Sequence, residues 1–114
     1  AIELDRQGTV DCVFYDCDNK DFVKYVEDFG FIESWGTFSD ISVLCPYWQV
    51  AGVNLSVGYS NEHTKYESLD SKALKSTIKK VKHMLADTDK RHFKYIPYRY
   101  YTPFYYILKN NKYN

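Results

Sequence analysis

A chain of 114 residues is long enough for one domain with a buried core. Its formal net charge of zero gives the molecule as a whole no electrostatic reason to bind nucleic acid or an anionic membrane. No apolar run approaches the roughly 20 residues of a membrane span, and no signal peptide is expected. The three cysteines, Cys12, Cys17 and Cys45, are too unevenly spaced for a disulfide framework or a Cys-x-x-Cys metal site. We therefore expect reduced cysteines in a cytoplasmic protein.

The charge is distributed unevenly along the chain. All fifteen Asp and Glu residues lie in residues 1–89 with nine of the Lys and Arg residues, so this part is net negative by six. Residues 90–114 carry six Lys and Arg residues and seven of the twelve tyrosines. We therefore divide the chain into an α/β domain over 1–89 and a basic, tyrosine-rich segment over 90–114. Aromatic and basic residues together can bind single-stranded nucleic acid, but packing on the sheet or contact with a protein partner is favoured.

The first half of the chain contains runs of strand-forming residues and one helical pattern. Apolar residues at helical spacing predict a helix over 22–29, which Gly30 closes. The stretch 41–48 is short and mixed, and Pro46 interrupts it, so no element is assigned there. The predicted strands are 2–6, 12–15 and 31–35.

The most informative pattern lies in the middle of the chain. Residues 53–57 alternate between apolar and polar side chains, which predicts a strand that Gly58 ends. A polar loop over 60–64 follows and contains His63. Apolar residues at spacings of four, three and four then predict a helix from about Ser68 to Ala86. The predicted core face of this helix consists of Leu74, Ile78, Val81 and Leu85.

Together these elements predict an α/β fold with a small mixed or mostly parallel sheet of about four strands and two main helices. His63 would lie beyond the carboxyl end of the strand that precedes it, the edge at which open α/β sheets bind ligands. His63 is therefore the first candidate for a functional residue.

Three segments occur in an order that resembles one enzyme family. They are Ile2-Glu-Leu-Asp-Arg6, Gly36-Thr-Phe-Ser-Asp40, and Val53-Asn-Leu-Ser-Val-Gly-Tyr59 followed by Glu62-His63-Thr64. Residues 1–88 are similar to the C-terminal half of the catalytic domain of zinc-dependent exopeptidases with two co-catalytic zinc ions. These aminopeptidases and carboxypeptidases have a three-layer, phosphorylase/hydrolase-like α/β fold.

The resemblance implies a role for four residues. Asp5 would match a carboxylate ligand of one zinc ion, and His63 an imidazole ligand of the other. Ser39 and Asp40 would match a pair that supports the site without binding metal. Zinc accepts carboxylate and imidazole ligands, and two zinc ions can activate one water and polarise the scissile carbonyl of a peptide. Without the family, an exposed strand end is the favoured interpretation of Asp5. His63 is then equally a surface loop or helix-entry residue, and the Ser-Asp pair equally a turn.

The family also uses a histidine, a bridging aspartate, a glutamate ligand and a glutamate general base, all upstream of the strand equivalent to 2–6. The resemblance therefore implies the C-terminal portion of a zinc exopeptidase that is inactive as an isolated chain. Strand 2–6 would be an exposed sheet edge, open to a second copy or to the missing N-terminal half. Peptides would be substrates of the complete enzyme. The alternative is a non-catalytic protein-interaction module that uses the sheet edge and the aromatic segment 90–114.

Overall fold

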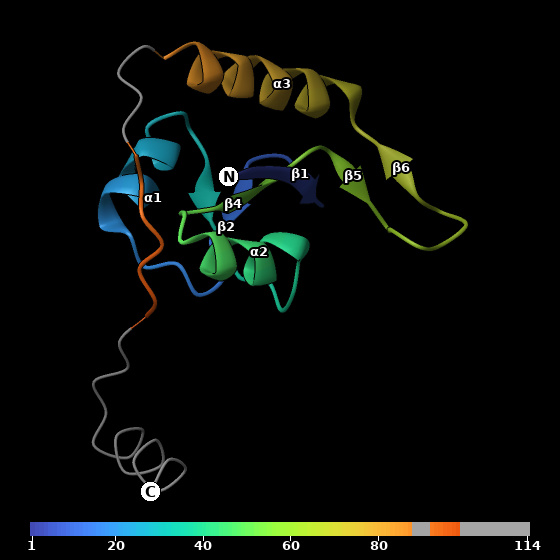
Figure 1. Cartoon of the computed structure of the whole chain (residues 1–114). Helices are drawn as coiled ribbons and strands as arrows, with labels where there is room; N and C mark the ends of the chain where they lie inside the picture. The colour runs from blue at the N-terminus through green and yellow to red at the C-terminus, as the bar shows by residue number, and fades with distance from the viewer. Residues whose placement is uncertain (88–91, 99–114) are drawn as a thin grey trace, which may run out of the picture.

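The computed structural model describes residues 1–87 and 92–98. In them the chain forms a four-stranded mixed sheet, a two-stranded antiparallel sheet and three helices (Figure 1). The predicted α/β class and the small mixed sheet are confirmed. In chain order the elements are β1 (Ile2–Arg6), β2 (Asp11–Val13), α1 (Lys20–Glu27), β3 (Ile32–Glu33), α2 (Asp40–Trp48), β4 (Val53–Ser56), β5 (Tyr59–Ser60), β6 (Ser68–Leu69) and α3 (Ser71–Ala86).

Strand β4 is the centre of the main sheet, whose order is β1-β4-β2-β3. It runs parallel to β1 and antiparallel to β2, and β2 runs parallel to β3. All four residues of β4 are buried, because elements pack on both faces of the sheet. Strand β1 pairs with β4 along one side only, so it lies at an edge among the described strands. The predicted edge position of 2–6 is thus observed.

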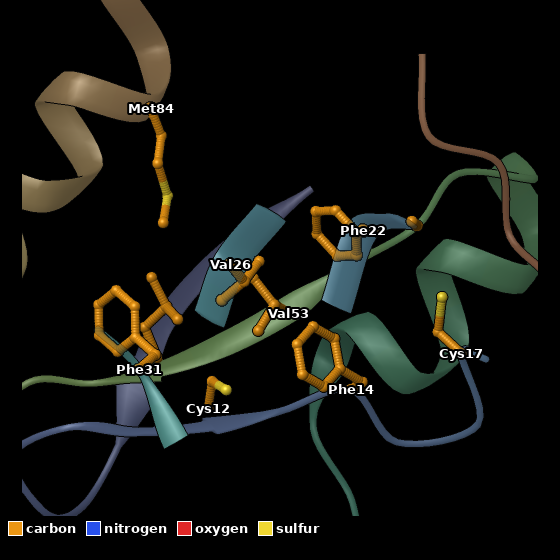
Figure 2. Close-up of a cluster of buried hydrophobic side chains, with 10 residues drawn as sticks. Cys12, Phe14, Cys17, Phe22, Val26, Phe31, Val53 and Met84 are labelled. Carbon is orange, nitrogen blue, oxygen red and sulfur yellow. The ribbon is translucent and has the colours of Figure 1, made fainter. Parts of the chain in front are cut away.

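The hydrophobic core lies on the face of the sheet that α1 and α3 cover. Val53 and Leu55 of β4 are fully buried in it. Figure 2 shows Met84 directed from α3 toward this cluster. The buried members of the cluster are Cys12, Phe14, Cys17, Phe22, Val26, Phe31, Ala51, Val53, Leu55 and Met84.

The three cysteines are free and buried. Burial, followed by the nearby Glu27 carboxylate, raises the pKa of the Cys12 thiol to about 12. Because a thiol reacts as its thiolate, Cys12 behaves as a small core residue and not as a nucleophile.

Helix α2 is an element that the sequence did not indicate. It spans Asp40–Trp48 and contains Pro46, so the described part of the chain has three helices and not two. Pro46 stands seven residues into the helix, where it removes one backbone donor. The helix persists because its inner side, with Ile41 and Cys45, is buried. Tertiary packing therefore outweighs the local penalty of the proline.

Helix α3 begins later than predicted, because Asp70 caps its first turn. The Asp70 carboxylate accepts hydrogen bonds from the backbone N–H groups of Lys72 (3.0 Å) and Ala73 (3.2 Å). Residues before the cap instead form β6, which pairs with β5 in a hairpin. The predicted polar loop is therefore the tip of this hairpin.

The buried face of α3 is displaced from the predicted one. Its buried residues are Ala73, Thr77 and Met84, whereas Leu85 is 64% exposed. The Thr77 hydroxyl donates to the Ser56 carbonyl at 2.7 Å in a buried position. This contact helps to set the rotation of the helix on β4. Of the predicted face, Leu74 is half-buried and Val81 packs against the core cluster, whereas Ile78 and Leu85 lie toward solvent.

Residues 92–98 return to the body of the fold. The Phe93 ring lies 5.1 Å from the Phe22 ring and 5.3 Å from the Tyr25 ring, centroid to centroid. The Phe93 carbonyl accepts a hydrogen bond from the Ala51 N–H at 3.0 Å. This part of the predicted segment 90–114 therefore packs on the core, and residues 90–91 and 99–114 lie outside the described residues.

Candidate ligand-binding pocket

A pocket of about 290 Å³ lies where the carboxyl ends of the parallel strands β1 and β4 face the start of α2. This is the edge at which α/β sheets bind ligands. Three of the four residues predicted as site residues, Asp5, Ser39 and Asp40, line it. The complete lining is Asp5, Arg6, Gln7, Tyr15, Gly36, Thr37, Phe38, Ser39, Asp40, Asn54, Tyr59 and Glu62.

Ser39 joins the start of α2 to β1. It is the N-cap residue of α2, and its hydroxyl donates to the Glu3 carboxylate at 2.6 Å. The same carboxylate oxygen accepts from the Ile41 N–H at 3.4 Å. A carboxylate at a helix N-terminus is stabilised by the helix dipole. Glu3 therefore fixes the position of Ser39 and of the adjacent Asp40.

Asn54 holds the irregular part of β1. The pairing register between β1 and β4 shifts between Glu3 and Arg6. In this interval the Asn54 side-chain carbonyl accepts from the Asp5 N–H at 3.0 Å, and its amide donates to the Tyr15 hydroxyl at 3.1 Å. Asn54 is only 3% exposed, so both bonds satisfy a buried polar group. A local irregularity of this kind re-aims side chains, and Asp5 is an exposed residue at the pocket wall.

Arg6 is the only Lys, Arg or His residue among the described residues that line the pocket. Its Nη2 donates to the Ser34 hydroxyl at 3.3 Å, and its Nε is buried with no acceptor in the described part of the chain. An unsatisfied buried N–H costs about 1–3 kcal/mol. The backbone at Gly36 approaches the Arg6 guanidinium closely, and a Cβ atom at that position would lie 3.5 Å from Nη1. No carboxylate among residues 1–87 and 92–98 lies within 4.0 Å of the guanidinium.

Tyr59 lines the pocket from β5. Its hydroxyl donates to the Asp5 carbonyl at 2.8 Å. Burial, then the carboxylates of Asp5 and Glu62, raise the pKa of the Tyr59 hydroxyl, while Arg6 opposes the rise. Asp5, Glu62 and Arg6 therefore all influence the Tyr59 hydroxyl. Tyr59 stays protonated at neutral pH and serves as a hydrogen-bond donor.

His63 does not line the pocket, although its neighbour Glu62 does. It is exposed in the β5–β6 hairpin, and its backbone has a φ of +61°. Asn61, two residues earlier, also has a positive φ of +54°. These left-handed residues bend the chain tightly at the hairpin tip. The structure thus places Glu62 at the pocket and His63 outside it.

The described residues provide only part of the ligand set that a zinc ion needs. Residues 1–87 and 92–98 contain no group of three or more His, Cys, Asp or Glu residues arranged to hold a metal ion. A zinc site requires three or four protein ligands. Asp5 offers a suitable carboxylate, but the described chain does not assemble a complete zinc site around it.

Several lining residues were not expected from the sequence pattern. Asn54 carried one signal, since it is an amide in a strand that alternates between apolar and polar residues. Tyr15 has a positive φ of +56°, which no residue pattern indicates. Tyr15 and Gly36 also line a neighbouring cavity of about 420 Å³, so the two cavities share a wall.

Comparisons with models of protein families, with curated proteins and with solved structures gave no significant match. In the described residues no helix has both the length and the apolar composition of a membrane span. The function must therefore be argued from the pocket itself.

Proposed function

We propose that this chain is the C-terminal portion of a peptidase-like hydrolase domain of the zinc exopeptidase type, and that it does not cleave peptides by itself. The observation that carries the proposal is the convergence of Asp5, Ser39 and Asp40 on one pocket. These residues come from segments far apart in the sequence, and the resemblance assigns all of them to one site. Their common pocket at the carboxyl ends of β1 and β4 supports that assignment.

The described residues do not fit a bound zinc ion on their own. Asp5 has the right donor atoms, His63 is exposed outside the pocket, and no third ligand accompanies them in the described ranges. We therefore derive no catalytic step for this chain. In the proposal, Asp5 and His63 are a partial ligand set that another polypeptide segment completes.

The proposal predicts a specific pattern of zinc affinities. Asp5→Ala and His63→Ala should each weaken zinc binding, measured by competition with a chromogenic chelator. Because the isolated chain holds only part of the ligand set, its zinc affinity should be weak, and each substitution should lower it further. The unaltered chain with zinc should release no amino acid from peptide substrates.

His83→Ala is the matched control, because it removes one imidazole from the exposed face of α3. It should leave zinc affinity unchanged. Equal affinities for the unaltered chain and the Asp5 and His63 variants would contradict the proposal. Peptide cleavage by the isolated chain would contradict its second half.

The alternative function is a non-catalytic interaction module, and the exposed strand β1 favours it. Leu4 in this strand is 42% exposed, and β1 has no partner on its outer side among the described strands. An unpaired edge strand pairs readily with another strand. In this proposal a second copy adds its own β1 to the edge.

The test is size-exclusion chromatography over a range of concentrations. We expect a concentration-dependent dimer, which Leu4→Lys should convert to a monomer because an edge lysine opposes pairing. Ile32→Lys, on the opposite edge strand β3 and 64% exposed in the native chain, should leave the dimer intact. A monomer at all concentrations with slow hydrogen exchange along residues 2–6 would show instead that the edge is covered within the chain.

A further inference from the structure

The unpaired Arg6 cation points to the chemistry of the ligand. A guanidinium offers five N–H donors in a planar fork, and Arg6 uses one of them in a 3.3 Å bond to a serine hydroxyl. Its Nε is buried and has no acceptor in the described chain, so a ligand in the pocket would bind through the two Nη groups. A carboxylate is the acceptor whose geometry matches this fork, because its two oxygens can accept two parallel hydrogen bonds. The pocket is therefore prepared for a carboxylate at Arg6.

The rest of the pocket has the opposite charge. Asp5, Asp40 and Glu62 line it, and none of them forms an ion pair within the described ranges. Asp5 lines the pocket from β1, and Glu62 lines it from the β5–β6 hairpin. Carboxylates that lack a cationic partner favour an ammonium group. A ligand that carries both charges can pair with Arg6 and with these carboxylates.

The size and remaining lining of the pocket fit a small ligand. Its volume of about 290 Å³ is at the lower limit of the range for small-molecule sites, about 300–1,000 Å³. Phe38 adds an apolar ring to the lining. A ligand with a carboxylate, an ammonium group and a short apolar side chain meets all three features.

We propose that this pocket binds a free apolar α-amino acid, with the ligand carboxylate on Arg6 and its ammonium group facing Asp5 and Glu62. The inference rests on the proposed function for its biological meaning, since a free amino acid is the product that an exopeptidase releases. The binding itself requires no metal ion and no catalysis. It is therefore measurable on the chain as it stands.

Three matched probes separate the two charged groups of the ligand. L-Leucine carries both, N-acetyl-L-leucine only the carboxylate, and L-leucinamide only the ammonium. We expect titrations in the presence of EDTA, followed by backbone amide NMR signals of Asp5, Gly36 and Asn54, to show binding of leucine. The two blocked probes should bind about tenfold more weakly or worse, because each loses one charge-assisted contact.

Variants test the residues. Arg6→Gln and Arg6→Lys should both weaken leucine binding about tenfold or more, since lysine keeps the charge but loses the fork. Lys75→Gln, which removes a cation from an exposed position on α3, should bind leucine like the unaltered chain. Asp5→Asn should weaken leucine and leave N-acetyl-L-leucine unchanged. Thermal unfolding of each variant identifies any that is destabilised.

Several results would overturn the inference. They are no binding of leucine, equal binding of leucine and leucinamide, equal binding of leucine and N-acetyl-L-leucine, or an Arg6→Lys variant that folds and binds normally. A different measurement tests the peptidase proposal, namely zinc affinity and its response to His63→Ala. Neither involves Arg6, so the two proposals can fail independently. If leucine binding depends on Arg6 while the Asp5→Ala and His63→Ala variants keep the zinc affinity of the unaltered chain, the chain is an amino-acid-binding module and not part of a zinc peptidase.

Discussion

Gly58→Ala should destabilise the protein by about 3 kcal/mol or more, because two separate penalties act at this position. Gly58 has a φ of +94°, which L-residues rarely adopt. A Cβ atom there would also lie 2.5 Å from the Asp70 carbonyl oxygen, which is backbone and cannot rotate away. The backbone of Gly58 meanwhile accepts from the Asp70 N–H at 2.7 Å and donates to the Gly8 carbonyl at 2.8 Å. The substitution therefore separates the start of α3 from the end of β4.

Gly30→Ala is the matched control for this effect. Gly30 has nearly the same φ, +92°, but a Cβ atom there would meet only the flexible end of Lys80, at 3.4 Å. The backbone penalty alone should cost about 1–2 kcal/mol. Chemical denaturation of both variants measures the difference. Equal losses would mean that the close approach of Asp70 to Gly58 contributes nothing.

Leu55→Ala should cost about 2–5 kcal/mol of stability, because it removes a fully buried side chain from the central strand. Leu55 is 0% exposed and belongs to the core cluster between the sheet and the helices α1 and α3. Neighbours on a four-stranded sheet cannot collapse into the space without breaking backbone pairing. The free energy of unfolding by urea measures the loss.

Leu85→Ala makes the same chemical change at an exposed position of α3. Leu85 is 64% exposed, so the change should stay within about 0.5 kcal/mol. The pair also tests the rotation of α3, because the sequence pattern had placed Leu85 on the core face. A loss at Leu85 as large as that at Leu55 would restore the predicted face and contradict the observed one.

The elements that the sequence predicted correctly are those with a strong local signal. Alternation along Val53–Ser56 and the β-forming run Ile2–Arg6 identify strands without knowledge of their partners. The rotation of α3 has no such signal, because a threonine hydroxyl bonding to Ser56 decides it and not the leucine spacing. Helix α2 was missed for the opposite reason: Pro46 is a strong local signal that burial of the helix overrides.

The residues of the candidate site likewise fall into those that the sequence indicated and those that it did not. The resemblance named Asp5, Ser39 and Asp40, and the topology brings them to one pocket. Arg6 and Asn54 could not be predicted, because their roles depend on which side-chain atoms lack or find partners in three dimensions. The exposure of His63 depends on the left-handed backbone of the hairpin tip. Residue order alone does not determine that conformation.

The sheet order also determines when the chain can fold during synthesis. The N-terminal ammonium of Ala1 donates to the Ala51 carbonyl at 2.7 Å, across 50 residues of sequence, and β1 pairs with nothing but β4 among the described strands. At a translation rate of about 5–20 residues per second, β1 waits roughly 3–10 s for its partner. Strands β2 and β3 are much closer in sequence, so their pairing and helix α1 can form first. Of the described strands, β1 is therefore the first to be synthesised but among the last to enter the sheet, and β4 is the strand whose arrival lets it pair.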